Sequence, residues 1–160
     1  MQKGKILFAE QDGNYILKFV GDVRLTLCST LDLFLESMLD NEGFKTVIID
    51  LSETDGIDST SLGLIAKIAV KMKRHHQVRP TIVSTNEDIS RILLSMGFDK
   101  VFILIRDAVQ GAEQLRELTV LQETEEQVKD RVVAAHRVLM DLNEHNRESF
   151  RDLVRSLEND

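Results

Sequence analysis

The sequence has few of the residues that mark disulfide-rich or membrane proteins. It contains one cysteine, one proline, no tryptophan and 5% aromatic residues. The single cysteine, Cys28, cannot form an internal disulfide, and its neighbours Leu27 and Leu31 favour a buried side chain over a reactive thiol. No stretch reaches the roughly 18 apolar residues of a membrane span, and the amino terminus lacks the apolar core of a signal peptide. These absences predict a cytoplasmic protein in a reducing compartment.

An excess of positive charge is also missing. The chain carries 20 basic and 27 acidic residues, for a net charge of −7. Nucleic-acid binding needs a concentrated excess of Lys and Arg, so nucleic acid is an unfavoured partner and another protein is favoured. The 160 residues and the 42% hydrophobic content are typical of one aliphatic globular domain with an appendage.

The first part of the chain predicts a β-hairpin and a helix. Apolar segments at residues 5–10 and 15–20 flank Asp12-Gly13-Asn14, whose residues tolerate the positive φ of a tight turn. Leucines and other apolar residues then recur at helical spacing between residues 27 and 39. Thr26 and Ser29 are the candidate caps of this helix.

Strands and helices alternate in the middle of the chain. Residues 46–51 form a continuous apolar run, as expected of a strand covered on both faces, and a helix follows from Ser59 to about His75. A strand at 81–84, a helix capped by Asn86 and closed by Gly97, a strand at 101–105 and a helix at about 107–118 complete the pattern. This order, ββαβαβαβα, predicts an α/β fold with a mixed, mostly parallel sheet and amphipathic helices.

The segment from Thr119 onward is different in character. It has ten acidic and six basic residues, so it holds a net charge of −4 out of −7. One apolar seam runs from Val128 to Leu142 and a second from Phe150 to Leu157, with a break at residues 143–146. We expect a domain at 1–118 and a helical extension at 119–160. The extension either packs on its own domain or forms a homodimer or partner contact.

Residues 58–63, with the sequence Asp-Ser-Thr-Ser-Leu-Gly, stand where the strand at 46–51 gives way to a helix. A hydroxyl at a helix start meets orphan N–H groups and the positive end of the helix dipole. A phosphate is therefore well accommodated on Ser59. The alternative is that Ser59 only caps the helix.

This pattern resembles the STAS domain of bacterial anti-sigma factor antagonists. The resemblance covers about residues 4–118 and rests on the hairpin, the strand at 46–51 and above all Ile57-Asp58-Ser59-Thr60-Ser61-Leu62-Gly63, with Val20-Gly21-Asp22 at the hairpin exit. It implies that Ser59 is phosphorylated by an anti-sigma factor that is a serine kinase and that the adjacent acid Asp58 supports partner contact. It also implies partner switching in transcription regulation: the unphosphorylated antagonist captures the anti-sigma factor, and a PP2C-type phosphatase restores this form.

Two residues depart from the family pattern. Ser61 stands where Gly is usual, and Arg24 stands where an acidic residue is common. On the helix after Ser59, Leu64 and Ile68 fall near the side opposite the core stripe, at 100° per residue. That second face is covered either by the carboxy-terminal helices or by a partner. The expected partner-binding residues are Arg24, Asp58, Ser59, Thr60, Ser61, Leu64 and Ile68.

Other functions have weaker support in the sequence. Ser59 is not in a Gly-x-Ser-x-Gly string and no motif places a His or Asp to activate it, so we expect no enzyme activity. Asp50, Glu53, Asp55 and Asp58 are interpreted as a solvated acidic loop, because no phosphate-binding motif accompanies them. No metal or other cofactor is expected. The second hypothesis for function is a scaffold or accessory subunit of a transporter or signalling assembly, without a switch.

Overall fold

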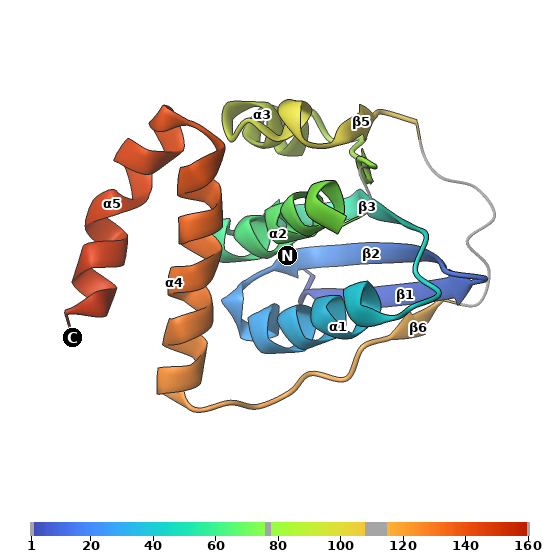
Figure 1. Cartoon of the computed structure of the whole chain (residues 1–160), viewed down its shortest axis with the longest axis horizontal. Helices are drawn as coiled ribbons and strands as arrows, with labels where there is room; N and C mark the ends of the chain where they lie inside the picture. Colours follow the sequence, from blue (N-terminus) through green and yellow to red (C-terminus); the bar gives the residue numbers. More distant parts are fainter. Residues whose placement is uncertain (1, 76–77, 108–114, 160) are drawn as a thin grey trace.

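The computed structural model describes residues 2–75, 78–107 and 115–159. Helices cover a six-stranded sheet, and two carboxy-terminal helices stand at one end of it (Figure 1). The strands are β1 (Lys5–Gln11), β2 (Asn14–Val23), β3 (Thr46–Ile57), β4 (Thr81–Val83), β5 (Ile103–Ile105) and β6 (Arg116–Glu117). The helices are η1 (Leu25–Leu27), α1 (Cys28–Asp40), α2 (Ser59–His75), α3 (Glu87–Ser95), η2 (Phe98–Lys100), α4 (Glu125–Leu142) and α5 (Glu144–Glu158).

The sheet is mixed and mostly parallel, as predicted. Its strand order is β5-β4-β3-β2-β1-β6. The three pairings from β2 to β5 are parallel, whereas β1 is antiparallel to both β2 and β6. Because β2 and β3 are parallel and in the middle of the sheet, their carboxyl ends meet at one edge, next to the start of α2.

The predicted hairpin is confirmed at the turn between β1 and β2. Gln11 pairs with Asn14, which leaves Asp12 and Gly13 as the two central residues. Both have positive φ, 53° and 87°, as a type I′ turn requires. Gly13 is also closely packed, because a Cβ there would lie 1.8 Å from the carbonyl oxygen of Gly43.

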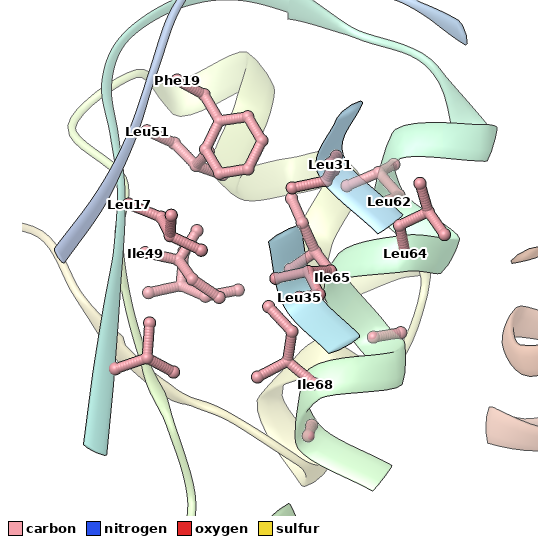
Figure 2. Close-up of a cluster of buried hydrophobic side chains, with 14 of the residues drawn as sticks. Leu17, Phe19, Leu31, Leu35, Ile49, Leu51, Leu62, Leu64, Ile65 and Ile68 are labelled. Carbon is pink, nitrogen blue, oxygen red and sulfur yellow. The ribbon is translucent and has the colours of Figure 1, made fainter. Parts of the chain in front are cut away.

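The core lies between the sheet and helices α1 and α2 (Figure 2). Side chains of β2 and β3 face side chains of the two helices across this layer. The labelled residues of the cluster are Leu17, Phe19, Ile49 and Leu51 on the strands and Leu31, Leu35, Leu62, Leu64, Ile65 and Ile68 on the helices. Full burial of one such side chain contributes about 1.5–3 kcal/mol to stability.

The last strands and the expected helix at 107–118 differ from the sequence prediction. Residues 108–114 lie outside the described residues, but Arg116 and Glu117 form β6 and pair with β1. A strand replaces the helix there because the outer edge of β1 offers unpaired backbone groups, and the Leu118 N–H also donates to the Ile6 carbonyl at 2.8 Å.

Strand β5 begins at Ile103, two residues later than predicted. The preceding residues form η2 and a turn, because the rings of Phe98 and Phe102 stack with centroids 5.2 Å apart in the core. Burial of both rings stabilises this turn more than two further strand residues would stabilise the sheet.

The ends of the helices follow the predicted signals in most cases. The Asn86 side chain accepts hydrogen bonds from two N–H groups at the start of α3, and Gly97 has a φ of 84° after its end. The predicted caps of α1 are wrong: Leu27 precedes the helix and no side chain caps it. Ser29, one of the two predicted caps, instead contacts the segment that leads to α4, and so does its neighbour Thr30.

The carboxy-terminal helices pack on their own domain, which is one of the two predicted alternatives. α4 lies across the amino-terminal ends of α1 and α2, and α5 packs against α4 (Figure 1). The break between the helices falls at Asn143, whose side chain caps α5 by accepting the Asn146 N–H at 2.7 Å. Asn146 is fully buried and its Nδ2 donates to the carbonyls of Met96 and Leu139, which joins α5 to α3 and α4.

Candidate functional site

The Ser59 hydroxyl lies at the junction where β3 ends and α2 begins. The Asp58 N–H donates to the Val23 carbonyl at 3.1 Å, which ties this junction to the end of β2. The Asp58 Oδ1 atom accepts the Ser61 N–H at 2.9 Å. Asp58 therefore caps α2, and the interpretation of Ser59 as the cap is wrong. Ser59 is the first helical residue, so its hydroxyl is available for another contact.

That contact is with His136 of α4, 77 residues away in the sequence. The Ser59 Oγ and His136 Nε2 atoms are 2.8 Å apart. The other ring nitrogen, Nδ1, lies 2.7 Å from the Val132 carbonyl oxygen, which can only accept. In the neutral imidazole the proton therefore resides on Nδ1, and the Ser59 hydroxyl donates to Nε2. His136 is only 2% exposed and packs edge-on against Phe150 of α5.

The sequence offered no motif that links His136 to Ser59. The seam from Val128 to Leu142 predicted the helix, and His136 lies directly beside the seam residue Ala135. The pattern did not predict the burial of His136, since Ala134, the other neighbour of Ala135, is exposed. The contact of His136 with Ser59 was also missed, because the crossing of two helices distant in sequence leaves no local signal.

Helices α2 and α4 are in close backbone contact at Gly63 and Ala135. A Cβ atom on Gly63 would lie 2.2 Å from the Ala135 carbonyl oxygen and 2.8 Å from the Ala135 Cβ. The helix backbones can come this close because the residues at the contact, glycine and alanine, are both small. Ala135 is 1% exposed and belongs to the hydrophobic core cluster, so α4 is an integral part of the fold in this form.

A charged network holds the amino-terminal half of α4 against α1. Asp32 is buried, and its two carboxylate oxygens accept from Lys67 Nζ at 2.7 Å and from Arg131 Nη1 at 2.6 Å. Arg131 also makes two bonds to the Glu123 carboxylate, at 2.7 and 3.0 Å, and Ser29 donates to the same carboxylate. The hydrogen bonds from Arg131 and Ser29 lower the pKa of Glu123 from its ordinary 4.5 to about 2.

A pocket of about 550 Å³ opens beside Ser59, between the start of α2 and the carboxy-terminal helices. Ser59 is half-buried, so its hydroxyl is neither fully sealed nor free at the surface. Apolar side chains of α4 and α5 form much of the wall, and charged groups lie among them. The lining residues are Leu25, Asp58, Ser59, Thr60, Glu123, Glu125, Val128, Lys129, Val132, His136, Leu153 and Leu157.

Two further predicted partner residues lie at the edge of this region. Asp58 is half-buried, and Arg24 is exposed just after the end of β2. The Arg24 Nε donates to the Asp22 carboxylate, and this hydrogen bond together with the nearby negative charge raises the pKa of Arg24. Arg24, Asp58 and Ser59 are thus the predicted contact residues that solvent reaches.

The other four predicted contact residues are buried. Thr60 and Ser61 lie inside the first turn of α2, at 4% and 1% exposure. Leu64 and Ile68 are 1% and 0% exposed and belong to the core, so the second face of α2 is covered within this chain and these two side chains are not accessible to a partner.

Of the two predicted covers, the carboxy-terminal helices do pack on α2, and α1 packs on it as well. Lys67, between them on the helix, bonds to Asp32 and Glu36, so this side of α2 faces α1. The sequence predicted that this second face is covered but did not predict α1 as a neighbour, and α2 packs against both α1 and α4.

The prediction that the four acidic residues near Ser59 form a loop is wrong. Asp50, Glu53 and Asp55 belong to β3, which continues to Ile57. Asp50 is buried and accepts the Ser52 N–H, while Glu53 pairs with Lys18 of β2. Within the described ranges, no group of three or more His, Cys, Asp and Glu side chains is arranged to hold a metal ion. Nor does any helix in these ranges have the length and apolar character to cross a bilayer.

Comparison with known proteins gives a family match and several structural neighbours. The STAS domain family model matches residues 5–112. The fold is similar to that of an anti-sigma factor antagonist from Mycobacterium paratuberculosis, with a TM-score of 0.57 and 19% identity over 66% of this chain and 87% of that one. It is also similar to the anti-sigma factor antagonist SpoIIAA in its unphosphorylated form, with a TM-score of 0.53 and 12% identity over 80% of this chain and 96% of that one. The phosphorylated form of Bacillus SpoIIAA matches with the same TM-score and identity, over 80% and 98% of the two chains.

Proposed function

This chain belongs to the STAS domain family, and on that premise we propose that it is an anti-sigma factor antagonist that works by partner switching. In this proposal, the protein binds an anti-sigma factor or a related regulator when Ser59 is unphosphorylated and releases it when Ser59 carries a phosphate. The observation that carries the proposal is the position of Ser59: its hydroxyl is the first of α2, is not used as the cap and borders an open pocket.

A phosphate on Ser59 would change the local charge strongly. It adds about −1.5 to −2 charge at neutral pH. The positive end of the α2 dipole and the N–H groups of the first turn stabilise that charge on the protein. Asp58 lies directly beside it, and Glu123 and Glu125 line the same pocket. A partner that buries this rim would have to desolvate the accumulated negative charge, so phosphorylation weakens the association without refolding the domain.

The proposal includes the enzymes that set the phosphorylation state. The kinase is the anti-sigma factor itself or an associated serine kinase, and a PP2C-type phosphatase reverses the modification. The chain itself has a regulatory role rather than a catalytic one, in the bacterial cytoplasm and in transcription regulation. His136 is bound through Nδ1 to a backbone carbonyl, and we assign it a structural contact with Ser59.

A pull-down with variants at Ser59 tests this function. Ser59→Ala used as bait in cell extract is expected to capture the anti-sigma partner, whereas Ser59→Asp captures at least about tenfold less, because the charge opposes binding. Ser95→Ala and Ser95→Asp serve as matched controls, since Ser95 is an exposed serine on α3. Equal capture by the Ala and Asp variants at position 59 would contradict the proposal. Phosphate-affinity electrophoresis of protein from cells is expected to show a shifted band that disappears in both Ser59 variants and persists in both Ser95 variants.

One observation favours the second candidate, a scaffold or accessory subunit of a transporter or signalling assembly. The Ser59 hydroxyl is bonded to His136, so its role could be purely structural. That function predicts no phosphorylated band in cells and co-purification with a membrane transporter, irrespective of the residue at position 59.

A further inference from the structure

The surface around Ser59 is shaped to receive a helix. The groove over Gly63 admits a helix backbone only if a small residue lies at the crossing point, and Ala135 meets this requirement. Four residues earlier on α4, Arg131 reaches the buried carboxylate of Asp32. One residue after the crossing point, His136 meets the Ser59 hydroxyl. These three contacts recognise a basic residue, a small residue and a hydrogen-bond acceptor along one helix.

The contacts of α4 are of a kind that can be exchanged. If α4 leaves, Asp32 keeps its ion pair with Lys67, so no lone charge is left in the domain. The Ser59 hydroxyl exchanges His136 for water. α4 also contributes two side chains, Ala135 and Leu139, to the apolar core, but α1, α2 and the sheet supply most of that core, and water cannot substitute for their apolar contacts. The free energy of lifting α4 is therefore smaller than that of opening the core.

The bond to His136 also depends on the state of Ser59. In the neutral imidazole, Nε2 is an acceptor and the Ser59 hydroxyl supplies the proton. A phosphorylated serine has no hydroxyl proton to donate and carries a bulky anion, so it does not fit the same contact. Phosphorylation of Ser59 is therefore incompatible with its contact to His136 of α4.

We propose that α4 is an intramolecular competitor of the partner: it occupies in cis the surface that a helix of the partner binds in trans, and the bond between Ser59 and His136 is its latch. The inference rests on the proposed function for the identity of the partner. The chemistry of the surface defines the binding element as an amphipathic helix with Arg or Lys four residues before Ala, Gly or Ser. Because α4 must open before the partner binds, the apparent Kd for the partner equals the Kd of the open form divided by the fraction of molecules that are open.

A peptide added in trans tests the surface without knowledge of the partner. The full-length Ala135→Glu variant places a charged side chain against the backbone at Gly63 and displaces its own α4. It is expected to bind a labelled peptide of residues 119–160 at least about tenfold more tightly than the wild-type chain does, measured by fluorescence anisotropy. The matched control is Ala134→Glu, because Ala134 is the adjacent residue and is exposed. A peptide carrying Arg131→Gln is expected to bind more weakly than the wild-type peptide.

Circular dichroism first verifies that the Ala135→Glu variant remains folded. If it does not, Arg131→Gln in the full-length chain replaces it, since Lys67 still neutralises Asp32 in that variant. Equal binding of the peptide to the opened variant and to Ala134→Glu would overturn the inference.

Partner capture separates this inference from the proposed function. With Ser59 intact and unphosphorylated in both baits, the variant with Ala135→Glu is expected to capture several-fold more anti-sigma partner than the variant with Ala134→Glu. Equal or lower capture would overturn the competitor role of α4. Peptide binding by Ala135→Glu, combined with no anti-sigma partner in any pull-down, would support the displaceable helix and contradict the proposed function.

Discussion

The two sides of α2 are packed by different means. Toward the sheet and α1, α2 presents apolar side chains that are fully buried (Figure 2). Toward α4, whose Ala135 and Leu139 also belong to the apolar core, it presents a glycine and a serine hydroxyl, and charged bonds lie at the margin. The first interface is stabilised by the removal of apolar surface from water, which has no solvent substitute. The second buries fewer apolar side chains and depends more on close approach and on polar bonds that water or another protein can replace. The comparison shows how one helix can be both a core element and part of a surface that opens.

The largest expected effect comes from the apolar side of α2. Ile65→Ala removes a fully buried side chain, and the resulting cavity is expected to lower the free energy of unfolding by about 2–5 kcal/mol. Urea denaturation followed by circular dichroism measures this change. Leu153→Ala on α5 is the control, because Leu153 is 41% exposed and its loss is expected to cost less than about 1 kcal/mol. Equal losses in the two variants would mean that the packing contrast is wrong.

The next effect comes from the side that faces α4. Gly63→Ala adds a Cβ that would lie 2.2 Å from the Ala135 carbonyl oxygen, so α4 must shift. We expect a loss of about 1–3 kcal/mol and faster hydrogen exchange in α4 and α5, with little change in the amides of β2 and β3. Gly43→Ala is the matched control, since the nearest atom to its new Cβ is 3.5 Å away. Uniform exchange across the whole chain would show that the two interfaces open together.

The smallest effect concerns the charged margin. Because the pKa of Glu123 is lowered to about 2, its ionised form stabilises the fold above about pH 4.5, and this contribution is lost as the pH falls through about 2. Glu123→Gln is therefore expected to be less stable than the wild-type chain at pH 7, and the difference narrows between pH 4.5 and pH 2. Thermal unfolding at several pH values measures it. Glu148→Gln, an exposed position on α5, is expected to show no such dependence. A constant difference across the pH range would exclude the ion pair as its cause.

Local signals in the sequence predicted much of this fold. The turn at Asp12 and Gly13, the start of α2 at Ser59 and the cap of α3 at Asn86 all depend on residues within a few positions of each other. The break between α4 and α5 follows the same rule. Each of these features depends on a backbone φ value or on the capping of free helix N–H groups, and residue type predicts both.

The features that sequence reasoning missed depend on tertiary contacts. β6 forms because the edge of β1 is available, and nothing in Arg116 and Glu117 signals a strand. The helical-wheel pattern indicated that the face with Leu64 and Ile68 is covered, but it did not reveal that α1 packs on α2 as α4 does. At the candidate site, Ser59 and its junction were predicted, whereas the capping role of Asp58 and the contact with His136 were not. The last of these joins residues that only the crossing of α2 and α4 brings together.

The connection between β6 and α4 has a consequence for any competitor. It is short and is itself anchored, because Thr30 Oγ1 donates to the Thr119 carbonyl and accepts the Leu121 N–H. A helix tethered in this way remains at an effective local concentration in the millimolar range even when it has detached. A partner present at micromolar concentration would therefore have to bind the same groove about a thousandfold more tightly than α4 does before it could hold the groove half of the time.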